Sequence, residues 1–227
     1  MGLNGKTAIV TGGTGGLGRV VVQRFIREGM NVVVTSRDHQ SALPGVEMIA
    51  ADVTVEKDVL ELFKNTVSRH GSVDILVNTV GGFLPESNVA DVSLDDWQRM
   101  MTINLLSAFL CTREGVRTMK GRKFGRIINI SALHGIQPMP GKAPYSIAKA
   151  GVALLSELVA REVKGTGITV NAIAPSIIVT EANKSSMPKA DITRWVSPQE
   201  IAEAICYLCS ESGGAINGTI LKLFGGL

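Results

Sequence analysis

Residues 11–18 read TGGTGGLG, and this glycine-rich stretch lies between a short apolar run, TAIVT (7–11), and a helical pattern that begins RVVVQRF. A strand, a glycine-rich turn and a helix in that order predict a turn that binds the phosphates of a dinucleotide. Gly12 permits a tight turn, Gly16 lets the backbone approach a pyrophosphate, and Gly18 permits close packing of helix on strand. The helix N-terminus then presents free N–H groups and a partial positive charge to the anion.

The end of the second apolar run predicts which dinucleotide binds. An NAD site typically has Asp or Glu there to accept from the ribose 2′-hydroxyl. This chain has the uncharged Ser36, followed by Arg37, whose planar guanidinium suits a 2′-phosphate. Asp38 comes two places late and is expected in the loop, and Gly15 leaves the glycine turn without a basic residue. The pattern favours NADP(H) over NAD(H).

Seven near-continuous apolar runs rich in Val and Ile follow one another along the chain. They occupy residues 7–11, 31–36, 47–52, 74–78, 126–131, 168–174 and 219–224. Such runs are typical of strands buried on both faces of a parallel sheet. Segments with helical periodicity alternate with them, at 16–28, 55–69, 94–120, 144–164 and 198–211. The alternation predicts one α/β domain over 1–227, a doubly wound Rossmann fold with a mostly parallel seven-stranded sheet and helices on both faces.

The composition excludes several classes of protein. A net charge of +3 without any block of like charge argues against nucleic acid and anionic membranes as partners. No apolar run reaches the ~20 residues of a membrane span, and the first residues carry no signal pattern. Three cysteines give no disulfide framework, and Cys206 and Cys209 are expected as buried helix residues, so no metal site is predicted. We expect a cytoplasmic protein.

A tyrosine and a lysine open one of the predicted helices. Tyr145 and Lys149 stand at i and i+4, which places both side chains on one face. A fixed ammonium ~4 Å from a phenol at an effective dielectric of ~20 stabilises the phenolate by up to about 4 kcal/mol. The sequence therefore predicts that Lys149 lowers the pKa of Tyr145, so that the phenol can act as a general acid when a carbonyl or imine is reduced.

These motifs together resemble those of the short-chain dehydrogenase/reductase family along nearly the whole chain. TGGTGGLG is similar to the family's TGxxxGxG, Tyr145 and Lys149 to its catalytic YxxxK, and Asn104 to the helix asparagine that positions a proton-relay water. The resemblance implies a catalytic set of Tyr145, Lys149 and Asn104. It also implies cofactor contacts from Gly12, Thr14, Gly16, Leu17, Gly18, Ser36, Arg37, Asp52, Val53, Asn78, Val80, Gly81, Tyr145, Lys149, Pro175, Ile178 and Thr180.

The chain departs from the family at the serine that holds the substrate. That position, thirteen residues before the tyrosine, is Ala132 here. Ser131 is its neighbour, but strand side chains alternate faces, so the Ser131 hydroxyl is expected to point away. The alternative, a strand that has already ended at Ser131 and lets the hydroxyl turn inward, stays open.

Two segments resemble the dihydropteridine reductase branch of the family, which has alanine at the serine position. These are VGGF (80–83) and SSMPKADITRW (185–195), and they suggest that Phe83, Ala132 and Trp195 line the substrate pocket. A flat conjugated ring can be held by stacking and hydrogen bonds without a serine. Asn104 and Arg37 oppose this likeness, because they follow the carbonyl-reducing, NADP(H)-using relatives.

Two functions remain open at this point. The first is an NADPH-dependent reductase of a C=O or conjugated C=N bond, 3-oxoacyl/ketone reductase-like or dihydropteridine reductase-like. The second is a catalytically silent NADP(H)-binding sensor or assembly protein, which the absent serine favours. Family resemblance also implies a homodimer or homotetramer built through the helices at 94–120 and 144–164.

Overall fold

The computed structural model describes residues 2–37 and 45–227, and its centre is a seven-stranded parallel sheet. The strand order is β3-β2-β1-β4-β5-β6-β7. The strands are β1 (Thr7–Thr11), β2 (Asn31–Ser36), β3 (Glu47–Ala50), β4 (Ile75–Asn78), β5 (Gly125–Ile130), β6 (Ile168–Pro175) and β7 (Ile220–Leu223). The order reverses between β1 and β4, which is where doubly wound sheets bind ligands. The predicted single-domain Rossmann fold is confirmed.

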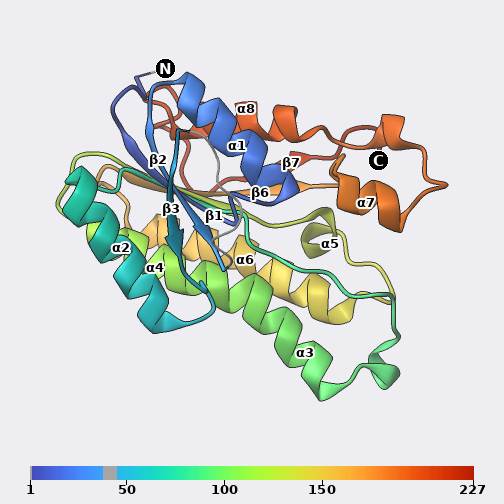
Figure 1. Ribbon diagram of the computed structural model, residues 1–227. Helices are drawn as coiled ribbons and strands as arrows, with labels where there is room; N and C mark the ends of the chain where they lie inside the picture. The colour runs from blue at the N-terminus through green and yellow to red at the C-terminus, as the bar shows by residue number, and fades with distance from the viewer. Residues whose placement is uncertain (1, 38–44) are drawn as a thin grey trace.

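Helices cover both faces of the sheet (Figure 1). Helices α1 and α8 pack on one face, and α2, α4 and α6 on the other. The helices are α1 (Gly16–Arg27), α2 (Glu56–His70), α3 (Leu94–Met100), α4 (Ser107–Met119), α5 (Leu133–Ile136), α6 (Ala143–Glu162), α7 (Glu181–Ser186) and α8 (Pro198–Cys209), with short 3₁₀ turns η1 (Val89–Asp91) and η3 (Ile192–Arg194). No helix among residues 2–37 and 45–227 is long and apolar enough to cross a membrane.

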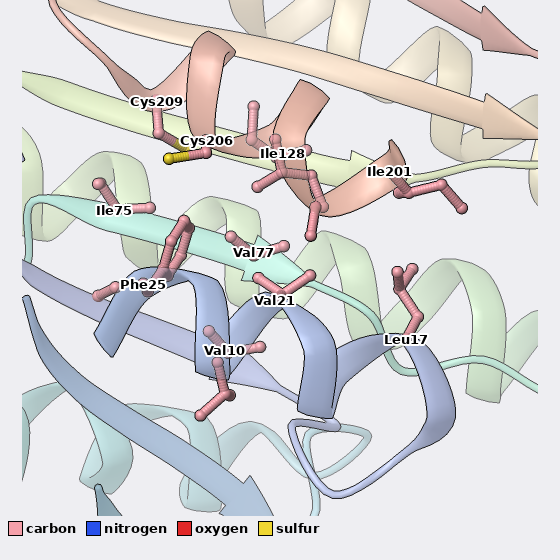
Figure 2. Close-up of a cluster of buried hydrophobic side chains, with 14 of the residues drawn as sticks. Val10, Leu17, Val21, Phe25, Ile75, Val77, Ile128, Ile201, Cys206 and Cys209 are labelled. Carbon is pink, nitrogen blue, oxygen red and sulfur yellow. The ribbon is translucent and has the colours of Figure 1, made fainter. Parts of the chain in front are cut away.

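Alternating strand side chains divide the core into two layers. Val10 faces α1 and α8, while its neighbour Ile9 faces α2 and α4. Figure 2 shows the first layer, in which Phe25 of α1 and the side chains of Cys206 and Cys209 of α8 belong to one apolar cluster over the sheet. Cys206 and Cys209 are therefore buried helix residues, as the sequence predicted. Burial on both faces explains the continuous apolar runs of the strands.

One predicted helix differs in structure from the expectation. The segment 94–120 was expected to be a single α-helix, but α3 and α4 are joined by a π-helical segment, η2 (Met101–Leu106). Wider π turns are rare and occur mostly at functional sites. The segment contains Asn104, so the deviation lies where the sequence predicts chemistry.

Candidate active site

The glycine loop connects the end of β1 to the start of α1, at the switch point of the sheet. Gly12 has φ +66°, a left-handed conformation that favours glycine. A Cβ on Gly18 would lie 2.2 Å from the Gly12 carbonyl oxygen, so backbone touches backbone there. A Cβ on Gly16 would lie 2.7 Å from Cγ2 of Thr180, which brings the segment after β6 against the loop. Side chains at these three positions would collide with neighbouring segments, so glycine keeps this loop, the cradle of the site, close-packed.

A cavity of about 670 Å³ lies beside this loop. That volume is within the usual range for small-molecule and cofactor sites. Eight predicted cofactor residues belong to its lining: Gly12, Thr14, Ser36, Arg37, Asp52, Val53, Val80 and Gly81. The α1 N-terminus, which has no acidic residue in its first turn, presents its N–H groups at the loop. The cradle and the cavity together fit a dinucleotide.

The lining of this cavity includes the end of β2, where the sequence predicts the choice between the two dinucleotides. Ser36 and Arg37 both belong to the lining. Hydrogen bonds from Thr54 hold the pKa of Asp52 below its ordinary value, and the nearby Arg37 guanidinium adds to that lowering. Asp38, expected in the loop that follows, lies outside the described residues.

Other predicted cofactor residues lie near the cavity but outside its described lining. Asn78 is 5% exposed, and its amide donates to Asn129 Oδ1 at 2.8 Å in a buried network. Asn78 therefore belongs to the buried network at the end of β4 and not to the cavity wall. Gly16, Leu17 and Gly18 follow the lining residues of the glycine loop directly in the chain. Lys149 lies beside Gly81, which lines the cavity. Thr180 caps α7 and lies against Gly16. Pro175 ends β6, and Ile178 forms an isolated bridge with Val196.

Tyr145 stands in the first turn of α6 with two aromatic neighbours. The Phe83 ring meets the Tyr145 ring edge-on, with centroids 5.3 Å apart. The His134 ring lies 6.4 Å away at a steep angle. Edge contacts of this kind fix ring orientation as well as burying apolar surface. The phenol is therefore held from two sides.

Lys149 and Asn104 converge on the loop that follows β4. A Cβ on Gly81 would lie 2.9 Å from Asn104 Oδ1 and 3.2 Å from Lys149 Nζ. The Asn104 amide brackets Gly82, donating to its carbonyl and accepting from its N–H at 3.1 Å each. Lys149 Nζ donates to the Ile130 carbonyl at 2.9 Å. Asn104 thus bonds the π segment to the β4 loop, and Lys149 bonds α6 to the end of β5, so these elements form one unit around Gly81.

The pKa directions in this unit differ from the sequence expectation. Burial raises the pKa of the Tyr145 phenol to about 12. Burial lowers the pKa of the Lys149 ammonium to about 8. The expectation that Lys149 lowers the phenol pKa is therefore wrong for this structure, because burial dominates and the ammonium bonds to the Ile130 carbonyl. The phenol is a proton donor throughout the neutral range.

A lysine with a lowered pKa makes folding stability depend on pH. Between pH about 8 and 10.5, the unfolded chain holds a proton on Lys149 that the folded chain has released. The unfolding free energy of the wild type, minus that of Lys149→Met, should therefore rise across this window by about 1–3 kcal/mol. Denaturant unfolding of both proteins at several pH values measures it. Lys184→Met, at an exposed lysine, is the control, and a difference that does not vary with pH would contradict the assignment.

Ala132 and Ser131 lie where β5 gives way to α5. Ser131 is 1% exposed, and its hydroxyl donates to the Lys149 carbonyl at 2.8 Å. β5 ends at Ile130, so the strand has already ended at Ser131 as the alternative supposed, but the hydroxyl is buried and bonded to the α6 backbone. Ala132 is the N-cap residue of α5 and contributes no hydroxyl.

A second cavity, of about 180 Å³, has Tyr145 in its wall. Phe83, predicted to contact the substrate, also lines it and is 54% exposed. Trp195 is only 7% exposed and, among the described residues, belongs to the lining of neither cavity. The structure therefore brings Phe83 to Tyr145 and leaves Trp195 buried at the C-cap of η3.

The sequence reasoning missed several lining residues. In the large cavity these come mainly from α3 and η2: Asp95, Gln98, Arg99, Thr102 and Ile103. A helix was predicted there, but periodicity does not reveal which face meets a distant loop. In the small cavity the missed residues include Lys142, whose place three residues before Tyr145 was the available signal.

Comparison with known proteins places the chain in context. The family profile described as "short chain dehydrogenase" matches residues 6–191. Glucose 1-dehydrogenase 2 of Bacillus subtilis (strain 168) is 33% identical over 99% of this chain and 95% of its own. A 3-oxoacyl-[acyl-carrier-protein] reductase of Synechocystis sp. is 34% identical over 99% and 98%. The solved structure "ElxO with NADP Bound" is 27% identical with a TM-score of 0.91, covering 97% of this chain and 98% of its own.

Proposed function

The chain belongs to the short-chain dehydrogenase family and is an NAD(P)-dependent oxidoreductase, and we propose that it uses NADPH to reduce a C=O or conjugated C=N bond. The observation that carries the proposal is the convergence of Tyr145, Lys149 and Asn104 on the loop that lines both cavities. Relatives named as 3-oxoacyl reductases and a neighbour titled with NADP support both parts of it.

The cofactor is held, in this proposal, along the large cavity. The glycine loop and the α1 N-terminus bind its pyrophosphate, Asp52 and Val53 its adenine, and Arg37 its 2′-phosphate. Lys149, Pro175, Ile178 and Thr180 serve the nicotinamide end. A bound nicotinamide dinucleotide supplies the hydride.

The side chains of α6 and the β4 loop carry out the remaining chemistry. Tyr145 donates its phenolic proton to the oxygen or nitrogen of the reduced bond, because its raised pKa keeps it protonated. The Lys149 ammonium stabilises the phenolate that results. Because its pKa is lowered to about 8, Lys149 can release and regain a proton near neutral pH. Asn104 holds the Gly82 backbone in place and, with it, the Phe83 ring that orients Tyr145.

The alanine at position 132 favours one of the two candidate substrate classes over the other. A simple ketone loses the hydroxyl that would hold its oxygen, whereas a dihydropterin-like ring is anchored by its own conjugated system. An NADPH-oxidation screen that sets β-ketoacyl thioesters against quinonoid dihydropterin tests the proposal. Turnover of either class supports a reductase, and the more active class identifies the bond reduced.

An Ala132→Ser variant tests whether the pocket has lost a group or never needed it. We expect less than about a threefold change in kcat/KM on simple ketones, since the wild-type pocket orients its substrate by other contacts. Steady-state kinetics on the ketone panel measures it. A gain of about 100-fold, the size of one oxyanion donor, would show that the native enzyme is merely impaired.

The alternative function is a silent NADP(H)-binding sensor or assembly protein. Ala132 is the observation that favours it, since the hydroxyl is replaced by a methyl group and Ser131 is turned away. Tight cofactor binding without turnover on a broad panel would support it.

A homodimer or homotetramer is proposed from the outer faces of α4 and α6. Exposed apolar side chains lie there and at the adjoining end of η2: Leu106, Phe109, Ile147, Leu154 and Leu158. Positions 147, 154 and 158 share one face of α6 by their helical spacing. Light scattering should give at least two chains per particle, and Leu154→Lys should shift the wild-type mass toward the monomer. A monomeric wild type would refute the assembly.

The buried cysteines suit a reducing, cytoplasmic location.

A further inference from the structure

Two loops meet above the small cavity and fix Lys142 next to Tyr145. The Ser87 N–H donates to the Gly141 carbonyl at 2.9 Å, which ties the loop after β4 to the loop before α6. Lys142 follows at once as the N-cap residue of α6, and Tyr145 stands in the first turn of that helix. The lysine and the tyrosine therefore line one cavity in a fixed relation.

The Lys142 ammonium is more enclosed than Glu86, its one carboxylate partner among the described residues. Its side chain is 16% exposed and lies 5.0 Å from the centre of the Phe83 ring. Glu86 is 3.1 Å away, but its side chain is 68% exposed. Such a water-facing pair contributes little, so a ligand anion can replace the carboxylate at small cost. The cation–π contact with the Phe83 ring holds the ammonium in the cavity when the carboxylate is displaced.

His134 lies beside Tyr145, outside the lining of both cavities, and is a second polar group without a partner among the described residues. Among the described residues, neither of its ring nitrogens forms a hydrogen bond, and Nδ1 is shut off from solvent. Burial and the Lys142 ammonium lower the pKa of His134, while Glu86 raises it, so both charges act at the ring. A neutral imidazole offers one donor and one acceptor. Buried polar groups are almost always paired, which makes this ring a candidate to pair with a ligand.

The remaining acidic group in the wall is already satisfied. Asp96 lines the cavity, but it accepts from the Ser93 hydroxyl at 3.0 Å and pairs with Arg99 at 3.5 Å. The charge available to a ligand inside the cavity is therefore that of Lys142. Ala132, the N-cap residue of α5, stands where the family resemblance implies a serine that holds the substrate oxygen, so orientation has to come from another part of the substrate.

We propose that Lys142 and His134 form an anion subsite beside Tyr145, which binds the carboxylate of a small oxo acid whose C=O is reduced. This rests on the proposed reductase function and narrows its substrate class. The carboxylate replaces Glu86 at the ammonium and takes no part in the reaction. The carbonyl carbon gains the hydride of NADPH, its oxygen gains the Tyr145 proton, and the products are a hydroxy acid and NADP⁺.

The test compares an acid with its uncharged ester. With 3-oxopentanoate, Lys142→Met should raise KM by about 10- to 100-fold, the size of a lost charge-assisted hydrogen bond, with kcat nearly unchanged. With methyl 3-oxopentanoate the same variant should match the wild type. Lys142→Arg should restore most of the acid's KM. His134→Phe, which keeps the ring against Tyr145, should raise the acid's KM by about tenfold.

Two further measurements separate the possible failures. Lys184→Met breaks the other Lys–Glu pair of the described chain, 2.8 Å long and outside both cavities, and should leave both substrates unaffected. Calorimetric titration of 3-oxopentanoate into the NADP⁺-bound protein reports the subsite without turnover. Equal KM values for acid and ester, or equal acid binding by wild type and Lys142→Met, would overturn the subsite while leaving the reductase intact. Acid binding without NADPH oxidation would instead refute the reductase.

Discussion

Replacing Tyr145 with phenylalanine should lower kcat for reduction by about 100- to 10,000-fold, the range for loss of a general acid, while NADPH binding changes little. The phenol is the proton donor in this account, and its raised pKa keeps it protonated at neutral pH. Phenylalanine preserves the edge contacts with Phe83 and His134, so the loss reports the hydroxyl alone. Stopped-flow NADPH oxidation and a fluorescence titration with NADPH measure the two quantities.

The chain provides a matched control for this substitution. Tyr207, its only other tyrosine, lies 47% exposed on α8, far along the chain from the site. Tyr207→Phe should retain wild-type kcat. Full activity in Tyr145→Phe would refute the mechanism, and equal losses in both variants would point to a general loss of folding.

Replacing Arg37 with leucine should raise KM for NADPH by about 10- to 100-fold and leave KM for NADH nearly unchanged. The guanidinium lines the end of the large cavity beside Ser36, where no carboxylate of β2 is present to accept from a ribose hydroxyl. Charge-assisted bonds to a 2′-phosphate depend on Arg37, whereas NADH has no group for it to bind. Steady-state kinetics with each dinucleotide measures the two effects.

The conservative variant refines this test. Arg37→Lys keeps the charge but loses the planar fork, so its KM for NADPH should lie between those of the wild type and Arg37→Leu. A wild type that turns over faster and at lower KM with NADH would contradict the assignment of NADPH.

Patterns local in the chain predicted the fold well. The glycine loop, the seven strands and the long helices needed only apolar runs and turn residues, because burial on both faces determines where a parallel strand can form. The π-helical segment at Asn104 was not predictable, since its residues have ordinary helix propensity and the deviation depends on bonds to Gly82. The short helices α5 and α7 were missed for a related reason: four and six residues are too few for a period.

The sequence predicted those site residues that belong to local motifs, and it failed for those that depend on contacts between distant segments. The Ser131 hydroxyl is bonded to the α6 backbone, and Trp195, expected near the substrate, is buried and lines neither of the two cavities. The pKa direction at Tyr145 failed because spacing along a helix says nothing of how deeply the phenol is buried. Lys142 and Phe83 come together only through the contact between the loop after β4 and the loop before α6, which no single stretch of sequence encodes.

The most direct test of the central claim is transfer of the reduced cofactor's hydride to a substrate. NADPH deuterated at the transferred position of C4 is incubated with the purified protein and the oxo-acid, thioester and pterin panel, and the products are analysed by mass spectrometry. A reductase predicts one deuterium per product molecule, equimolar NADP⁺, and loss of both signals in Tyr145→Phe. Saturable NADPH binding with no labelled product from any member of the panel would contradict the account and favour the silent binding protein.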